Sequence, residues 1–342
     1  MKNRGFGSDN YSGVHPLVLN ALSEASCGHA SPYANDEYTA ELENKFKEMF
    51  GQDTQTFLVY NGTGANILAI SAFMQTYEAV VSAQSAHINV DECGALEVQL
   101  GSKIMTIPSA NGKITVEDIK TQLAHVGDQH RTQPRVVSIS QPTELGTLYT
   151  SEEIKEIADF AHANDMYLHM DGARFANAVA ALGCTPADIT TNVGVDALSF
   201  GGTKNGMMFG EAVLFFNKTL PKQAKYLRKQ QMQLHSKGRF IAAQFLRMLQ
   251  DDLWLSTASH SNRMAAILAR EASKVDGVEI IQEIETNQLF ATLPKDAIEP
   301  LKQHCFFYTW NEERNEVRWV CSFDTTIEDI NGFVSAIKDL LK

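Results

Sequence analysis

Between about residue 40 and residue 216 the chain alternates between two hydrophobic patterns. Short apolar or β-branched runs, typical of buried strands, are separated by longer stretches with the period of helices. This alternation predicts an α/β fold in which crossover helices join a largely parallel sheet. The expected strands are 56–61, 79–83, 102–107, 135–140, 166–171, 195–201 and 211–216, and the expected helices include 39–50 and 65–77.

The pattern changes after Leu220. Helical stretches come first, short strand-like runs follow them, and a final helix closes the chain. Short strands closed by a terminal helix predict a small α+β domain. We therefore expect a large domain over 16–250 and a small C-terminal domain over 251–342. The expected elements are helices over 222–234, 239–253 and 259–275, strands over 288–293, 305–310 and 316–323, and a final helix over 327–342.

Composition narrows the class of protein. The 342 residues include 29 Lys and Arg against 41 Asp and Glu, a formal net charge of −12, which argues against nucleic acid or an anionic membrane as a partner. The sequence has no apolar run of about 18 residues and no apolar segment near its start, so we expect a cytoplasmic protein without a membrane span. Its five cysteines are scattered without a C-x-x-C pair, which predicts reduced thiols and no metal site.

Candidate chemistry lies where the apolar runs end, because ligands of open parallel sheets bind at the carboxyl ends of strands. The first such junction is the glycine-rich turn Asn61-Gly62-Thr63-Gly64, which precedes a helical stretch. Backbone N–H groups at a helix N-terminus would stabilise a phosphate. The turn is not G-x-G-x-x-G and lacks a Walker lysine, which argues against dinucleotide and P-loop sites. A turn that serves only packing is the alternative.

Two further junctions carry an acid and an amine. Asp171 ends one strand-like run, and Lys204 lies among glycines after another, one βαβ unit further along the chain. Both side chains are therefore expected in one crevice. Asp171 would hold a ring nitrogen protonated, although capping a helix or pairing with Arg174 are alternatives. A lysine with restricted exposure has a lowered pKa that suits Schiff-base formation.

A fourth junction carries a histidine. His87 follows the run 79–83. A lone histidine is more often a structural hydrogen-bonding residue than a catalyst. At a strand end with an apolar neighbour, its ring could also stack on a flat ligand ring.

Four segments of the chain carry a resemblance to a known family: HMDGARFANA (169–178), SFGGTKNG (199–206), Ser8-Asp9-Asn10 and SPYANDEYTAELE (31–43). Together they resemble the threonine aldolases, which are pyridoxal phosphate enzymes with the fold of aspartate aminotransferase (fold type I), and the likeness is continuous from about residue 7 to the C-terminus. The resemblance implies an α/β fold with a large, mostly parallel, seven-stranded sheet domain and a small α+β C-terminal domain. It also implies that residues 1–15 form an N-terminal arm that contributes to the active site.

The resemblance also implies roles at the cofactor. Lys204 would bind pyridoxal phosphate covalently, Asp171 would pair with its ring nitrogen, and His87 would stack on its ring. These three are the expected catalytic residues. The turn Gly62-Thr63-Gly64 would hold the phosphate, and Arg174 is expected to contact the cofactor as well as the substrate.

For the substrate, the resemblance implies a carboxylate clamp made of Ser8, Arg174 and Arg318, because guanidinium groups match carboxylates. A salt bridge at the rim is the alternative for Arg318. The resemblance further places the active site at a subunit interface of a homo-oligomer, a dimer or a dimer of dimers. Tyr33 would reach a neighbouring substrate site and Arg239 a neighbouring phosphate, unless both are ordinary surface residues.

Residues 140–146 depart from the family pattern. Many threonine aldolases carry a second histidine here, whereas this chain reads Ser-Gln-Pro-Thr-Glu-Leu-Gly. His87, Glu144 or a water held by the cofactor phosphate are candidates for the base that acts on the substrate β-hydroxyl. Glu144 lies in a turn flanked by proline and glycine, so we expect it to be solvated and expect the base to be His87 or the water.

The expected activity is retro-aldol cleavage of L-threonine, L-allo-threonine and related β-hydroxy-α-amino acids to glycine and an aldehyde. β-Elimination or transamination on the same scaffold is the enzymatic alternative, since the cofactor permits any bond of Cα to break and the protein chooses by orienting one of them. A cofactor-binding subunit without turnover is the non-enzymatic alternative. The sequence leaves open the threo or allo preference and the size of the aldehyde.

Overall fold

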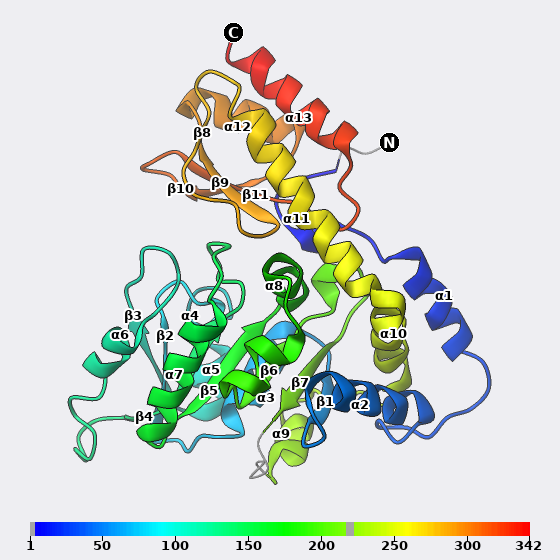
Figure 1. The fold of residues 1–342 in the computed structure, drawn as a ribbon, viewed down its shortest axis with the longest axis vertical. Helices are drawn as coiled ribbons and strands as arrows, with labels where there is room; N and C mark the ends of the chain where they lie inside the picture. Colours follow the sequence, from blue (N-terminus) through cyan, green and yellow to red (C-terminus); the bar gives the residue numbers. More distant parts are fainter. Residues whose placement is uncertain (1–3, 217–221) are drawn as a thin grey trace.

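The computed structural model describes residues 4–216 and 222–342, so the first three residues of the expected arm lie outside the described residues. Two β-sheets form the centres of two lobes, and one long helix joins them (Figure 1). In the part of the chain that is described, no helix is long and apolar enough to cross a membrane.

The larger sheet has seven strands in the order β1-β7-β6-β5-β4-β2-β3. Four neighbouring pairs within β3-β2-β4-β5-β6 are parallel, and β7 runs antiparallel to both β6 and β1. The expected mostly parallel, seven-stranded sheet is therefore confirmed. Its strands are β1 (Gln55–Val59), β2 (Glu78–Ala83), β3 (Lys103–Ile107), β4 (Gln133–Ser140), β5 (Tyr167–Gly172), β6 (Ala197–Phe200) and β7 (Glu211–Phe215).

Helices cover both faces of this sheet. They bury the apolar side chains that its strands point to either side. Neighbouring residues such as Val80 and Val81 belong to different apolar cores, because successive residues of a strand point to opposite faces. Side-chain caps fix several helix starts; the Thr150 hydroxyl, for example, accepts the Glu153 N–H. The helices are α1 (Pro16–Ala25), α2 (Glu37–Phe50), α3 (Gly62–Ser71), α4 (His87–Val90), α5 (Ala95–Leu100), α6 (Val116–Thr121), α7 (Ser151–Ala163), α8 (Phe175–Leu182), α9 (Ala224–Gln230) and α10 (Arg239–Leu249).

The smaller sheet is antiparallel, in the order β10-β11-β9-β8, and helices pack against it. Its core contains Trp319 and Phe333, whose ring centroids lie 5.1 Å apart. Phe6 of the N-terminal arm joins this core, 4.9 Å from Phe333. The expected small α+β domain is therefore confirmed. Its elements are β8 (Glu279–Ile280), β9 (Gln288–Thr292), α12 (Lys295–His304), β10 (Tyr308–Asn311), β11 (Glu316–Val320) and α13 (Ile327–Leu340).

One helix, α11 (Leu253–Ala272), belongs to both lobes (Figure 1). The expected break before residue 259 is wrong: the chain turns instead at Asp251 and Asp252, which have left-handed φ angles of 54° and 52°. Trp254 at the start of α11 packs in the large core and Leu268 near its end packs in the small one. The domain boundary at residue 250 stays a prediction, because α11 contributes to both cores.

Candidate active site

A cavity lies at the carboxyl edge of the large sheet, where parallel sheets bind ligands. Residues that follow or end β2, β4, β5 and β6 meet there. Six of the residues singled out from the sequence line it: Gly62, His87, Glu144, Asp171, Arg174 and Lys204. The rest of the lining comes from Asn66, Ser140, Pro142, Thr143 and Ala173.

Asp171 is held in place by two N–H donors. The Ala173 backbone N–H donates to Oδ1 (2.9 Å), and the Asn66 side-chain amide donates to Oδ2 (2.8 Å). The residue is 7% exposed. These bonds fix a carboxylate against the wall of the cavity, whereas the expected alternative partner, Arg174, pairs with a different acid.

The Asn66 amide also connects Asp171 to the histidine. It donates to Glu92 Oε1 (2.9 Å), and that oxygen lies 2.8 Å from His87 Nδ1. The hydrogen bond with Glu92 raises the pKa of His87 above its usual value, although partial burial opposes the shift. The sequence analysis missed Asn66 and Glu92. Glu92 could have been found from the sequence, because it is an acidic residue only five positions after His87.

Replacing His87 by phenylalanine is expected to destabilise the cofactor-free protein by about 1–3 kcal/mol, because the fully buried Glu92 carboxylate loses a hydrogen-bond partner. The folded-state pKa of His87 is raised, so its contribution to stability is present below the ordinary value of 6.5 and is lost as the pH rises through the folded-state pKa. The difference from wild type in urea unfolding should therefore shrink as the pH rises.

A second substitution separates this effect from a general packing defect. Glu92→Gln in the His87→Phe background should recover part of the loss, since a buried neutral amide costs less than a buried carboxylate. A stability difference independent of pH and of Glu92 would contradict the assignment.

Lys204 lies in a short turn after β6, packed against the Asp171 turn. A Cβ on Gly201 would lie only 2.3 Å from the Ala173 carbonyl oxygen, so glycine permits this close approach. The Gly202 N–H donates to Glu211, a buried carboxyl group on β7 whose pKa burial raises to about 7. Burial, followed by the nearby Arg174 charge, lowers the pKa of Lys204. A larger fraction of its amine is therefore neutral and nucleophilic near neutral pH.

Arg174 forms a two-bond ion pair with Asp9 of the N-terminal arm. Arg174 Nε lies 2.6 Å from Oδ2 of Asp9, and Nη2 lies 2.9 Å from Oδ1. Burial alone would lower the pKa of Arg174, but the Asp9 carboxylate outweighs it and the pKa is raised. Ser8, the neighbour that the sequence analysis favoured, accepts the Asn10 N–H with its hydroxyl oxygen and does not line the cavity.

Arg318 on β11 does not line the cavity. Its guanidinium is 5.1 Å from the Trp310 ring, and burial followed by the charge of Arg174 lowers its pKa. Among the described residues, neither Tyr33 nor Arg239 lines the cavity. The Tyr33 N–H donates to the Ser236 carbonyl, so its loop lies beside the segment that leads into α10.

The expectation that Glu144 is solvated is wrong. Its Oε1 atom accepts the His87 backbone N–H (2.9 Å) and the Ser140 hydroxyl (2.7 Å). Its Oε2 atom is buried and has no hydrogen-bond partner among the described residues. Burial and then the Asp171 charge raise the pKa of Glu144. The Pro- and Gly-flanked turn folds inward because groups distant in sequence enclose it.

Comparison with known proteins agrees with this geometry. A sequence profile of the family described as β-eliminating lyase matches residues 5–295. The low specificity L-threonine aldolase of Pseudomonas aeruginosa is 43% identical over 335 residues, which are 97% of this chain and 96% of that protein. The low specificity L-threonine aldolase of Saccharomyces cerevisiae is 30% identical over 86% of this chain and 75% of its own.

Solved structures agree as well. The threonine aldolase of Leishmania major superposes with a TM-score of 0.93 at 32% identity, over 99% of this chain and 100% of that one. A putative L-allo-threonine aldolase from Listeria monocytogenes shares the fold, with a TM-score of 0.74 at 18% identity over 99% and 97% of the two chains. The expected fold is therefore confirmed. The chain belongs to the β-eliminating lyase family, among the low-specificity L-threonine aldolases.

Proposed function

We propose that this protein is a pyridoxal phosphate-dependent aldehyde-lyase that cleaves L-threonine, L-allo-threonine and related β-hydroxy-α-amino acids to glycine and an aldehyde. One observation carries the proposal: a desolvated lysine, a fixed carboxylate and a histidine from three different strand ends line the same cavity. The 43% identity to a low specificity L-threonine aldolase over nearly the whole chain supports the same activity.

The residues of the cavity fit the cofactor. Lys204 offers an amine of lowered pKa, and Asp171 offers a carboxylate that two N–H groups hold in place. At the start of α3, helical geometry leaves the N–H groups of Gly62 and Thr63 without carbonyl partners in the helix, as a phosphate requires. A Cβ built on Gly62 meets open space, so an anion has room there. The Gly64 N–H is already bound to Asn61 Oδ1 (2.8 Å).

When bound, pyridoxal phosphate supplies an aldehyde that bonds covalently to amines and a ring that withdraws electrons from Cα of an amino acid. Lys204 would hold it, and Asp171 would keep a proton on its ring nitrogen. Arg174 gives two of its five N–H donors to Asp9, so the others remain for the substrate carboxylate. Arg318 would complete this clamp, because its buried Nε has no partner among the described residues.

Product analysis tests the proposed activity. Purified protein supplied with pyridoxal phosphate is incubated with L-threonine and, separately, with L-allo-threonine. We expect glycine and acetaldehyde in equal amounts. The family description favours one rival, β-elimination, which would give 2-oxobutyrate and ammonia from the same substrates. Formation of 2-oxobutyrate without glycine would replace our proposal with that one.

We also propose a cytoplasmic homo-oligomer, a dimer or a dimer of dimers. The five free cysteines support a reducing compartment. Tyr33 and Arg239 lie outside the cavity of their own chain, which supports a role at a neighbouring subunit's site. The solution mass by light scattering should be two or four times that of one chain. A fully active protein with the mass of a single chain would contradict the oligomer.

A further inference from the structure

We propose that Glu144 is the group that accepts the proton of the substrate β-hydroxyl. The inference rests on the proposed aldolase function. It names a base for the β-hydroxyl, because residues 140–146 lack the second histidine that many threonine aldolases carry there. Glu144 lines the cavity together with Asp171 and Lys204. Its Oε1 is bound by His87 N–H and Ser140, but its buried Oε2 has no partner among the described residues. A buried carboxylate oxygen without a donor is suited to receive a hydroxyl group from a ligand.

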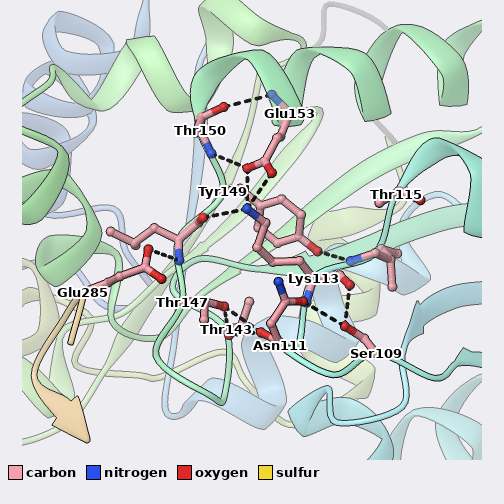
Figure 2. A network of polar contacts seen from close by, with 12 residues as sticks. Ser109, Asn111, Lys113, Thr115, Thr143, Thr147, Tyr149, Thr150, Glu153 and Glu285 are labelled. Atoms are coloured by element: carbon pink, nitrogen blue, oxygen red, sulfur yellow. Dashed lines mark hydrogen bonds and ion pairs between the residues drawn. The ribbon is translucent and has the colours of Figure 1, made fainter. Parts of the chain in front are cut away.

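The loop that carries Glu144 is held firmly within the large domain. The Thr143 and Thr147 hydroxyls lie 2.7 Å apart across its base, and Thr147 also donates to the Asn111 carbonyl (Figure 2). Tyr149 at the end of the loop accepts the Ile114 N–H with its hydroxyl oxygen (2.7 Å). These bonds fix both ends of a short segment, so its side chain keeps one position.

The small domain holds the same loop from the other side. The Leu148 N–H donates to Glu285 (3.0 Å; Figure 2), and the Gln288 side chain donates to the Thr143 carbonyl (3.1 Å). The Thr286 hydroxyl donates to the Gly146 carbonyl (3.0 Å). A carboxylate that must meet a substrate hydroxyl at hydrogen-bond distance needs a support of this kind, since misplacement by about 1 Å can cost roughly 100-fold in rate.

The charged and titratable groups around Glu144 favour it over the histidine as the proton acceptor. Burial and the Asp171 charge raise the pKa of Glu144, which makes its carboxylate a stronger base, while Arg174 is the nearby cation. The Nδ1 atom of His87 is already engaged by the buried Glu92 carboxylate at 2.8 Å, a hydrogen bond that raises the pKa of His87. Lys204 lines the same cavity and has a pKa lowered by burial, and Tyr149 on the other side has a pKa raised by burial.

The proposed step balances in atoms and electrons. The β-hydroxyl proton passes to Glu144, and the O–H electron pair becomes the second bond of the aldehyde carbonyl as Cα–Cβ breaks. The electron pair of the broken bond stays with Cα and the bound cofactor. One proton then returns to Cα, so that glycine and the aldehyde together carry all the hydrogens of the starting amino acid.

The test replaces Glu144 by glutamine, which keeps an oxygen for His87 N–H and Ser140 but cannot accept a proton. Threonine cleavage should fall by about 10²–10⁴-fold, the usual contribution of a general base. The visible absorbance of bound pyridoxal phosphate should stay unchanged. Exchange of the glycine α-proton in D₂O, followed by NMR, should also stay within a few-fold of wild type, because glycine has no hydroxyl. Glu156→Gln, the same change at an exposed position of α7, should leave every readout unchanged.

A pH profile gives a second readout. Cleavage requires the ionised Glu144 carboxylate, so kcat/KM for threonine should fall as the pH drops through the pKa of Glu144. The Ser140 hydrogen bond lowers that pKa. Ser140→Ala should therefore move the fall in kcat/KM to higher pH. Glu144→Asp keeps a carboxylate and should still show this fall at low pH, whereas Glu144→Gln should not.

The outcomes separate this inference from the function on which it rests. Cleavage by Glu144→Gln within about fivefold of wild type, or an equal loss of glycine exchange, would overturn the role of Glu144 and leave the aldolase proposal standing. Absence of threonine cleavage by the wild-type protein, with intact glycine exchange, would overturn the aldolase function and this inference with it.

Discussion

Lys204→Ala is expected to abolish covalent cofactor binding and to reduce threonine cleavage by at least about 10³-fold, since the variant loses the nucleophile that the mechanism requires. Lys204 alone among the predicted site residues is an amine, and burial, followed by the nearby Arg174 charge, lowers its pKa. The visible absorbance of the protein-bound cofactor and threonine turnover are the two measurements.

Borohydride reduction followed by peptide mass spectrometry supplies the decisive control. In the wild-type protein the reduced adduct should map to Lys204, and in the variant it should be lost. Lys225→Ala, at an exposed position of α9, should behave like wild type. A reducible adduct on another lysine, together with retained turnover, would show that Lys204 is not the attachment site.

Asp171→Asn is expected to reduce cleavage by about 10²–10³-fold, the usual cost of removing a charge that stabilises a transition state. Folding should survive, because the asparagine oxygen can still accept the Ala173 N–H. Its amide nitrogen would face the Asn66 amide nitrogen, however, so a loss of about 1–3 kcal/mol in the free energy of unfolding is expected. Turnover and urea unfolding measure the two effects separately.

The matched control is Asp159→Asn on α7, where an exposed acid undergoes the same chemical change. It should alter neither turnover nor cofactor absorbance. If Asp171→Asn cleaved threonine at nearly the wild-type rate, the carboxylate would serve only to hold the turn at Ala173, as the helix-cap alternative from the sequence supposes.

Much of the fold was predictable because its signals are local. Apolar runs such as 79–83 and 135–140 overlap the observed strands, since a strand buried on both faces needs continuous apolar residues. The break between α10 and α11 was predicted at the wrong place. The turn uses left-handed aspartates at 251 and 252, a conformation for which the sequence carries no glycine signal.

The sequence by itself determined which side chains stand at strand ends. Asp171 lies at the end of β5 and Lys204 follows β6, the next strand along the chain and parallel to β5. The carboxyl ends of parallel strands share one edge, so the meeting of these two residues in the cavity follows from their order along the chain. The helix start at Gly62 is equally local, because a glycine-rich turn and the Asn61 cap are adjacent in sequence.

Only the tertiary structure decided the ion-pair partners and the burial of the charged groups in the cavity. The Asp9 carboxylate meets Arg174 across 165 residues of sequence, which occupies part of a guanidinium that the sequence offered wholly to the substrate. Glu144 is enclosed by His87 N–H and by a loop that the small domain holds. Desolvation depends on what packs around a group in space, and residues far apart in sequence leave no periodic signal of their contact. The sequence therefore predicted a solvent-exposed Glu144, whereas its burial in the folded protein makes it a candidate base.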